Sequence, residues 1–285
     1  MKTFLIFNDN SSEARHAAEF TLAIAQKIQA DIILFNTAAA TRRVAEKVPA
    51  GYIFKSGGDQ DKYQRKDELQ ISETLHHLRM LNKEQLNFKP EIEEVDISQM
   101  NEVKVAELIN KNNIWMMIKG MSDITASDNS NQALNIHTVL NKVLCPLLLI
   151  PANWQLKDIE RMAYIADLRY CRIQIVRFLA ELARPWKAVL SIAHKSADGL
   201  PDMDEKYALT VFSEEVCRRV NYDQIFFNNI KEKDLSKVVD VIINGMHNDV
   251  LVMVNHRNHF QEIVGRYITD TLPVHVTIPV LVFPS

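Results

Sequence analysis

The sequence predicts an α/β protein built from two domains in tandem, each a five-stranded, mostly parallel sheet with helices on both faces. Three observations lead to this prediction. Short apolar runs alternate with helical periodicities along the whole chain of 285 residues, a pattern typical of strand–helix–strand units. The order of these runs in the first half recurs in the second half. Two segments of the first half also match segments of the second half residue by residue.

The first half begins with a strand and a capped helix. Thr3–Phe7 is a short apolar run that suits a buried strand, and Ser11 or Ser12 can cap a helix whose apolar side recurs from Ala14 to Ile28. Ile32–Phe35 suits a second strand, and a crossover of this length implies parallel pairing. The remaining pattern predicts helices over 71–86, 103–109 and 133–143 and strands over 91–97, 114–119 and 147–150.

The second half follows the same order. Its apolar runs predict strands over 162–166, 188–193, 224–227, 250–254 and 280–283, with helices over 173–183, 207–220, 235–246 and 263–272. The charged stretch over 37–66, which contains three glycines, has no counterpart in this half. We therefore interpret that stretch as an insertion in the first domain.

Two matched segments support the duplication. Cys145–Pro151 matches Ile278–Pro284, and Phe7–Asp9 matches Ile165–Asp167. The distance between the two matched segments is 25 residues shorter in the second copy, which is about the length of the insertion. The predicted domains therefore cover 1–152, with the insertion at about 37–66, and 157–285.

Composition limits the function. The net charge is −3, so no overall positive field would attract nucleic acid or an anionic membrane. The apolar run at the N-terminus is too short for a signal peptide or a membrane span. Three scattered cysteines without a CxxC motif indicate reduced thiols and a cytoplasmic location. Seven glycines are few for a protein that holds phosphate on its backbone.

Four residues follow predicted strands at the edge where parallel α/β sheets bind ligands: Asp9, Gly120, Asp167 and Asn255. A turn or helix-capping role is favoured over a ligand role for each aspartate, and for Gly120 a positive φ after its strand is favoured. The histidines of Asn255–His259 have no third ligand at a convincing spacing, so no metal site is expected.

These features resemble the universal stress protein family in its tandem two-domain form. The resemblance covers nearly the whole chain and rests on the Asp9 and Asp167 turns, the loops around Gly120 and Asn255, and the two closing strands. It implies Rossmann-like domains that pair through their last strands as an intrachain pseudo-dimer, and it leaves a homodimer open. In nucleotide-binding members, the aspartate after the first strand contacts adenosine.

Nucleotide-binding members also carry Gly-x2-Gly-x9-Gly-Ser/Thr after the fourth strand. The glycines let backbone N–H groups approach phosphate, and a helix N-terminus faces the charge. Counting from Gly120 puts Asp123, Ala133 and Leu134 at the next three positions, so one position of the four matches. An aspartate at position 123 would also bring negative charge toward a phosphate.

The second copy has lost the same motif. Counting back from Gly265 gives Asn255 and Val252, and Arg266 stands where Ser or Thr belongs, so again one position matches. Neither copy is therefore expected to bind ATP in the family's usual manner. A different mode, with Arg257 or Arg266 on the phosphate, stays open.

The sequence thus predicts a non-enzymatic stress-adaptation module with an unidentified protein partner, no cofactor and no catalytic residues. One alternative is a binding protein for an adenine nucleotide or another small ligand, with Asp167 and Arg266 as the better candidate site because a cation can replace missing backbone donors. A second alternative is an ATP-hydrolysing or nucleotidyl-transfer enzyme, for which we find no cluster of catalytic groups.

Overall fold

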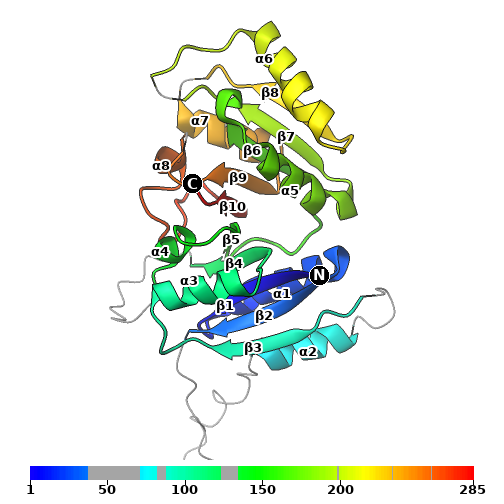
Figure 1. Ribbon diagram of the computed structural model, residues 1–285, viewed down its shortest axis with the longest axis vertical. Helices are drawn as coiled ribbons and strands as arrows, with labels where there is room; N and C mark the ends of the chain where they lie inside the picture. The colour runs from blue at the N-terminus through cyan, green and yellow to red at the C-terminus, as the bar shows by residue number, and fades with distance from the viewer. Residues whose placement is uncertain (38–70, 82–87, 123–133, 198, 233, 258) are drawn as a thin grey trace, which may run out of the picture.

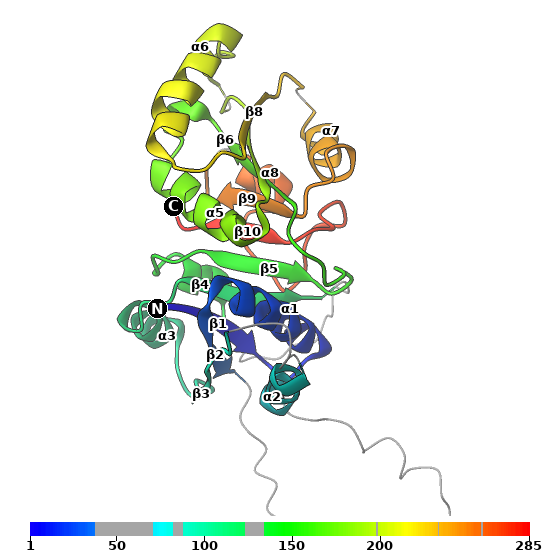
Figure 2. The same ribbon diagram turned by 90° about the vertical axis from the view of Figure 1, so that its right-hand side faces the viewer.

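The computed structural model describes residues 1–37, 71–81, 88–122, 134–197, 199–232, 234–257 and 259–285. Within these residues, ten strands form one continuous sheet in the order β3-β2-β1-β4-β5-β10-β9-β6-β7-β8. Neighbouring strands are parallel except β5 and β10, which are antiparallel. Helices lie on both sides of the sheet (Figures 1 and 2). The predicted fold class is therefore confirmed.

The elements alternate along the chain as the apolar pattern requires. The first half contains β1 (Lys2–Asn8), α1 (Ser12–Ile28), β2 (Ala30–Asn36), α2 (Ile71–Leu81), β3 (Ile92–Asp96), α3 (Glu102–Lys111), β4 (Met116–Met121), α4 (Ile136–Leu140) and β5 (Leu147–Pro151). The second half contains β6 (Arg161–Ala166), α5 (Ile173–Ala183), β7 (Val189–His194), α6 (Glu205–Val211), β8 (Ile225–Asn229), α7 (Leu235–Asp240), β9 (Val250–Val254), α8 (Phe260–Ile263) and β10 (Val280–Phe283).

The strands agree with the sequence pattern better than the helices do. The predicted helix over 263–272 is wrong, because α8 ends at Ile263 and the chain beyond it is irregular. Gly265 has a φ of 110° there, outside the helical range. The predicted helices over 207–220 and 235–246 begin as α6 and α7 but continue as π turns, Phe212–Val216 and Val241–Gly245.

Two predicted helices and the insertion reach into residues that the structure does not describe. The helix over 133–143 is α4, which covers 136–140, and residue 133 lies outside the described residues. The helix over 71–86 is α2, described as far as Leu81. Of the insertion at about 37–66, only Thr37 lies within the described residues.

The strand register relates the two halves. Positions on the first, fourth and fifth strands that lie side by side are Leu5, Met117 and Leu147 in the first half and Ala163, Leu251 and Val280 in the second half. The same correspondence aligns Asp9 with Asp167 and Cys145 with Ile278, as in the sequence comparison. The limits of the two domains stay predictions.

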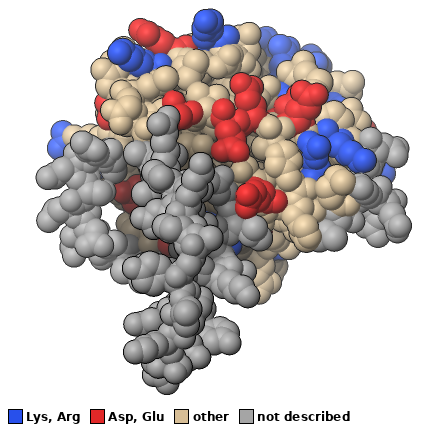
Figure 3. Space-filling model, turned by 90° about the horizontal axis from the view of Figure 1, so that it is seen from below, with Lys and Arg blue, Asp and Glu red and all other residues tan. Residues whose placement is uncertain are grey.

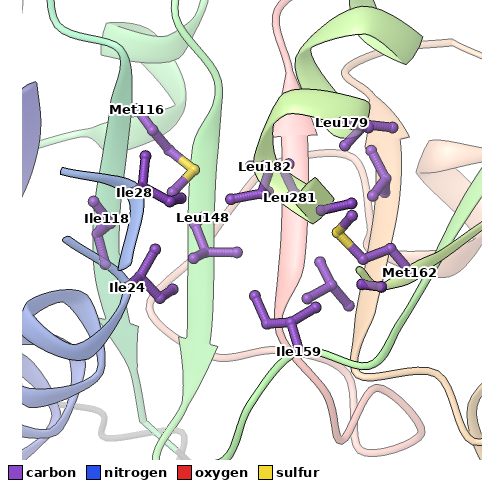
Figure 4. Close-up of a cluster of buried hydrophobic side chains, with 14 of the residues drawn as sticks. Ile24, Ile28, Met116, Ile118, Leu148, Ile159, Met162, Leu179, Leu182 and Leu281 are labelled. Atoms are coloured by element: carbon purple, nitrogen blue, oxygen red, sulfur yellow. The ribbon is translucent and has the colours of Figure 1, made fainter. Parts of the chain in front are cut away.

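The seam between the halves is the antiparallel pair of β5 and β10, both fully buried. Apolar side chains from both halves pack together across it (Figure 4), and they include Ile24, Met116, Leu148, Met162, Leu179 and Leu281. Burial of a Leu or Ile side chain is worth about 1.5–3 kcal/mol. Two such clusters contain residues of both halves, so the halves share their cores, and separating them would expose two apolar strands to water.

The outer edges of the sheet differ in chemistry. β3 forms one edge and exposes Glu93 and Glu94, charges that disfavour edge-to-edge pairing. On the end of the molecule in Figure 3, acidic and basic side chains lie interspersed. β8 forms the other edge, where Phe226 is exposed.

No helix of the described residues is long and apolar enough to cross a membrane.

Candidate functional site

Asp9 lies just beyond β1, at the carboxyl edge of the first half, and is exposed. Its Oδ1 accepts hydrogen bonds from the backbone N–H and the hydroxyl of Ser11, with the nitrogen at 3.0 Å. Ser11 in turn caps α1 by accepting from the N–H of Ala14 at 3.1 Å. Asp9 thus stabilises the turn that starts α1, while its carboxylate still faces solvent.

Gly120 has a packing role that the sequence analysis did not foresee. It lies inside β4, paired with Ile150, and its φ is not positive, so the suggested positive-φ role is wrong. A Cβ at this position would lie 2.2 Å from the carbonyl oxygen of Glu13. The first turn of α1 therefore crosses directly over β4, and only glycine leaves room for it.

Asp167 stands at the equivalent position of the second half, but it is completely buried. Its Oδ1 lies 2.9 Å from Nε of Arg169, and its Oδ2 lies 2.7 Å from Nη2 of Arg169 and 2.9 Å from the N–H of Ala197. Burial by itself raises the pKa of this carboxyl, but the Arg169 side chain and the N–H of Ala197 outweigh it and hold the pKa below its usual value. Both oxygens are already engaged within the chain.

The other predicted residues of the second half are not among the hydrogen-bond partners of Asp167, which within the described residues are Arg169 and Ala197. Arg257 and Arg266 are exposed, and the Arg266 guanidinium lies 5.3 Å from the ring centre of Tyr267. Gly265 lies between them and is half-buried. The structure therefore pairs Asp167 with Arg169 and not with Arg266, the partner that the sequence analysis favoured.

Asn255 connects the two halves instead of facing solvent. It is fully buried just beyond β9, and its Nδ2 donates to Oδ1 of Asn141 in the first half at 2.7 Å. Its own Oδ1 has no hydrogen-bond partner among the described residues.

An aromatic cluster lies beside this contact. The His137 ring of α4 meets the rings of His256 and Tyr267 edge-on, with centroids 4.9 and 5.2 Å apart. Nδ1 of His137 accepts a hydrogen bond from the N–H of Ile268 at 3.3 Å. Burial, and then the charge of His256, lower the pKa of His137. A neutral His137 therefore holds the second-half segment after Gly265 against the first half.

That segment continues to the carboxyl end of β4. The carbonyl of Asp270 accepts from the N–H of Ser122 at 2.9 Å, and its carboxylate pairs with Lys119 at 3.2 Å. Ser122 also forms a parallel bridge with Thr271. The second half thus covers the place where the first-half loop begins, while the motif positions Asp123 and Ala133 lie outside the described residues.

Sequence reasoning missed three residues of these contacts: Arg169, Asn141 and His137. One signal was visible, because Arg169 follows Asp167 by two residues whereas Ser11 stands in the equivalent place after Asp9. Pairing at that spacing needs only a local turn. Asn141 and His137 meet partners more than a hundred residues away, which no local pattern records.

The comparisons with known proteins agree with this architecture. No family model and no curated protein matches the sequence. A universal stress protein from Archaeoglobus fulgidus has a similar structure, with a TM-score of 0.56, 14% identity and coverage of 99% of this chain and 98% of that one. The cytoplasmic domain of a prokaryotic cation chloride cotransporter matches with a TM-score of 0.50 and 11% identity, covering 99% and 94% of the two chains.

A third structure, from Pseudomonas aeruginosa UCBPP-PA14 and described as a universal stress protein, gives a TM-score of 0.48 at 13% identity, with 100% of this chain and 93% of that one covered. Likeness at these identities concerns the fold. The resemblance seen in the sequence is confirmed at that level. Along its whole length, this chain has the fold of the universal stress proteins.

Proposed function

We propose that the chain is a non-enzymatic regulatory module of the universal stress protein type, with degenerate phosphate loops and with its two halves acting as an intrachain pseudo-dimer. The observation that carries this proposal is the pairing of Asp167 with Arg169. In nucleotide-binding members of the family, the aspartate at this position contacts adenosine. Here the guanidinium of Arg169 binds that aspartate instead.

The energetics favour the internal pair over a ligand. A nucleotide at this position would have to displace hydrogen bonds from Arg169 and Ala197 to a fully buried carboxylate. Each charge-assisted hydrogen bond is worth about 1.5–3 kcal/mol, and an unpaired buried charge costs about 3–5 kcal/mol. Ribose hydroxyls are neutral donors and replace an arginine poorly.

The loop after β9 supports the same proposal. Asn255 is bound to Asn141, and the segment after Gly265 is held by His137 and by Ser122. These contacts hold the loop against the first half at the seam. A phosphate site would need the same loop to present free N–H groups to an anion.

Nucleotide binding through the first half is the second candidate function, because Asp9 differs from Asp167 in one respect. It is exposed, and among the described residues its carboxylate accepts hydrogen bonds from Ser11 alone. The adenosine contact made by nucleotide-binding members of the family at this position therefore fits Asp9 better than Asp167. We further propose a protein partner, and a cytoplasmic location in view of the free Cys145, Cys171 and Cys217.

Calorimetric titration of the full chain with Mg-ATP tests these proposals, and the matched variants are Asp9→Asn and Asp167→Asn. We expect no binding tighter than about 1 mM, equivalent to about 4 kcal/mol, and no phosphate release. Micromolar binding that disappears in Asp9→Asn would establish the second candidate. Micromolar binding that disappears in a folded Asp167→Asn protein would overturn the main proposal.

A further inference from the structure

A cavity of about 550 Å³ lies at the seam between the halves. Its walls come from α3 and the residues before β4 and β5 in the first half, and from α5 and the end of β10 in the second half. Small-molecule sites in proteins typically measure about 300–1,000 Å³. None of the ligand residues predicted from the sequence lines this cavity, so it is separate from the strand-end positions described above.

One part of the wall is aromatic and flat. The rings of Trp115 and Phe178 are stacked, with centroids 4.3 Å apart and planes 20° apart. Phe283 meets Phe178 edge-on at 5.2 Å. All three line the cavity. Trp115 and Phe178 face each other, and Lys2 Nζ lies 4.6 Å from the centre of the Trp115 ring, so the surface favours a planar apolar group that packs against the ring edges.

The charge in this cavity is not balanced. Arg172 lines it and is half-buried, and among the described residues it is the one charged residue in the lining. Nη1 of Arg172 donates to the carbonyl of Pro284 at 3.1 Å, and within the described residues no carboxylate pairs with this guanidinium. Arginine has five N–H donors, so most of them are left to face the cavity or water.

The start of α5 adds to this positive end. Arg172 is the N-cap residue of α5, which has no side-chain cap, and Gln174 and Ile175 of its first turn also line the cavity. The N–H of Ile175 donates to the carbonyl of Arg172 at 2.9 Å, and the partial positive charge of the helix start favours an anion nearby. A half-buried cation beside an apolar wall is most stable when an anion accompanies it.

We propose that this cavity binds a small organic anion with a planar apolar body and one carboxylate or sulfonate group. The body packs on Trp115 and Phe178, and the anionic group binds Arg172. This goes beyond the proposed function, because it uses none of the residues on which that function rests. Since both halves line the cavity, the ligand also stabilises the seam through binding linkage.

The test uses 8-anilinonaphthalene-1-sulfonate, a sulfonate with a planar naphthalene body, whose fluorescence rises in an apolar site. We expect saturable one-to-one binding to the full chain. Arg172→Gln should weaken binding about tenfold or more, since a charge-assisted contact is lost. Arg177→Gln is the matched control, because Arg177 belongs to the same helix, bonds to the carbonyl of Arg219 and does not line the cavity. It should change the affinity less than about twofold.

A second pair of variants keeps the test independent of Arg172. Leu144 lies on the rim and is 88% exposed, so its replacement leaves the core intact. Leu144→Asp and Leu144→Asn differ only in charge. The sulfonate should bind more weakly to the Asp variant than to the Asn variant, whereas the neutral analogue N-phenyl-1-naphthylamine should bind both equally.

The proposal is overturned if the sulfonate fails to saturate a single site, or if Arg172→Gln binds it as the native protein does. Equal sulfonate binding to Leu144→Asp and Leu144→Asn would overturn it as well. None of these outcomes bears on the titration with Mg-ATP, so the two proposals fail separately.

Discussion

The guanidinium of Arg169 contacts both carboxylate oxygens of Asp167, with Nε at 2.9 Å from Oδ1 and Nη2 at 2.7 Å from Oδ2. The equivalent aspartate of the first half, Asp9, has Ser11 in place of the arginine. One chain therefore contains two equivalent strand-end aspartates, one closed off from solvent by an arginine and one open to solvent.

Arg169→Ala should destabilise the protein by about 3–5 kcal/mol, because it leaves Asp167 buried without its cation. The folded-state pKa of Asp167 is lowered, so its contribution to stability is complete above the unfolded pKa of about 3.9 and is lost as the pH falls through the folded-state value. The deficit of the variant should therefore be largest near neutral pH and shrink in acid. Urea denaturation at several pH values measures it.

The control for this experiment is Arg218→Ala, which removes an exposed ion pair with Glu214. Its cost should stay below about 0.5 kcal/mol. A cost for Arg169→Ala that is no larger than the cost for Arg218→Ala would show that the Asp167 pair does not hold this turn.

Gly120→Ala should destabilise the protein by about 1–3 kcal/mol or more, because the added Cβ would meet the backbone of Glu13. Gly245→Ala is the matched glycine, since its nearest neighbour would be the side chain of Val241 at 3.6 Å. We expect that variant to lie within about 1 kcal/mol of the native protein. Thermal unfolding compares the two, and equal midpoints would refute the close approach of α1 to β4.

His137 should make the seam sensitive to pH. Its pKa is lowered in the folded protein, so the unfolded chain, with a pKa of about 6.5, takes up a proton first as the pH falls. Stability should thus be complete above about pH 6.5 and decline below it. His194, whose pKa is also lowered, should add to the decline.

His137→Gln removes one of these two titrations and should flatten the profile of unfolding free energy between about pH 7 and pH 5. His77→Gln is the control, because His77 is exposed on α2. Identical pH profiles for the native protein and His137→Gln would contradict this account of the seam.

Leu148→Ala should lower the free energy of unfolding by about 2–5 kcal/mol, because it leaves a cavity in the shared core. Variants that keep only Trp115, in the first half, or only Trp186, in the second half, of the three tryptophans place one fluorescent reporter in each half. Both reporters should follow one transition, shifted by the same amount. Two separate transitions would mean that each half folds by itself.

The sequence predicted the strands well because β5, β9 and β10 are buried on both faces and are therefore short, unbroken apolar runs. The region after Gly265 was predicted incorrectly as a helix because its backbone groups bond to distant partners. The N–H of Ile268 binds His137, and the carbonyl of Asp270 binds Ser122. Apolar periodicity carries no information about such bonds.

The candidate site, too, could be predicted only in part from the sequence. Its strand-end positions were predictable, because parallel sheets place them at one edge. Whether an aspartate there is open or closed depends on side-chain geometry, as the contrast between Asp9 and Asp167 shows. The cavity that Arg172 lines arises only where two distant segments meet, so no run of residues could have indicated it.

The antiparallel seam also has an evolutionary consequence. Because β5 and β10 run in opposite directions, the strands of the two halves point opposite ways. Their carboxyl ends therefore lie at opposite edges of the sheet along the strand direction. In a symmetric dimer of identical subunits, one mutation changes both edges at once. Joining the halves in a single chain removes that constraint, so the two edges can differ, as they do in the partners of Asp167 and Asp9, Arg169 and Ser11.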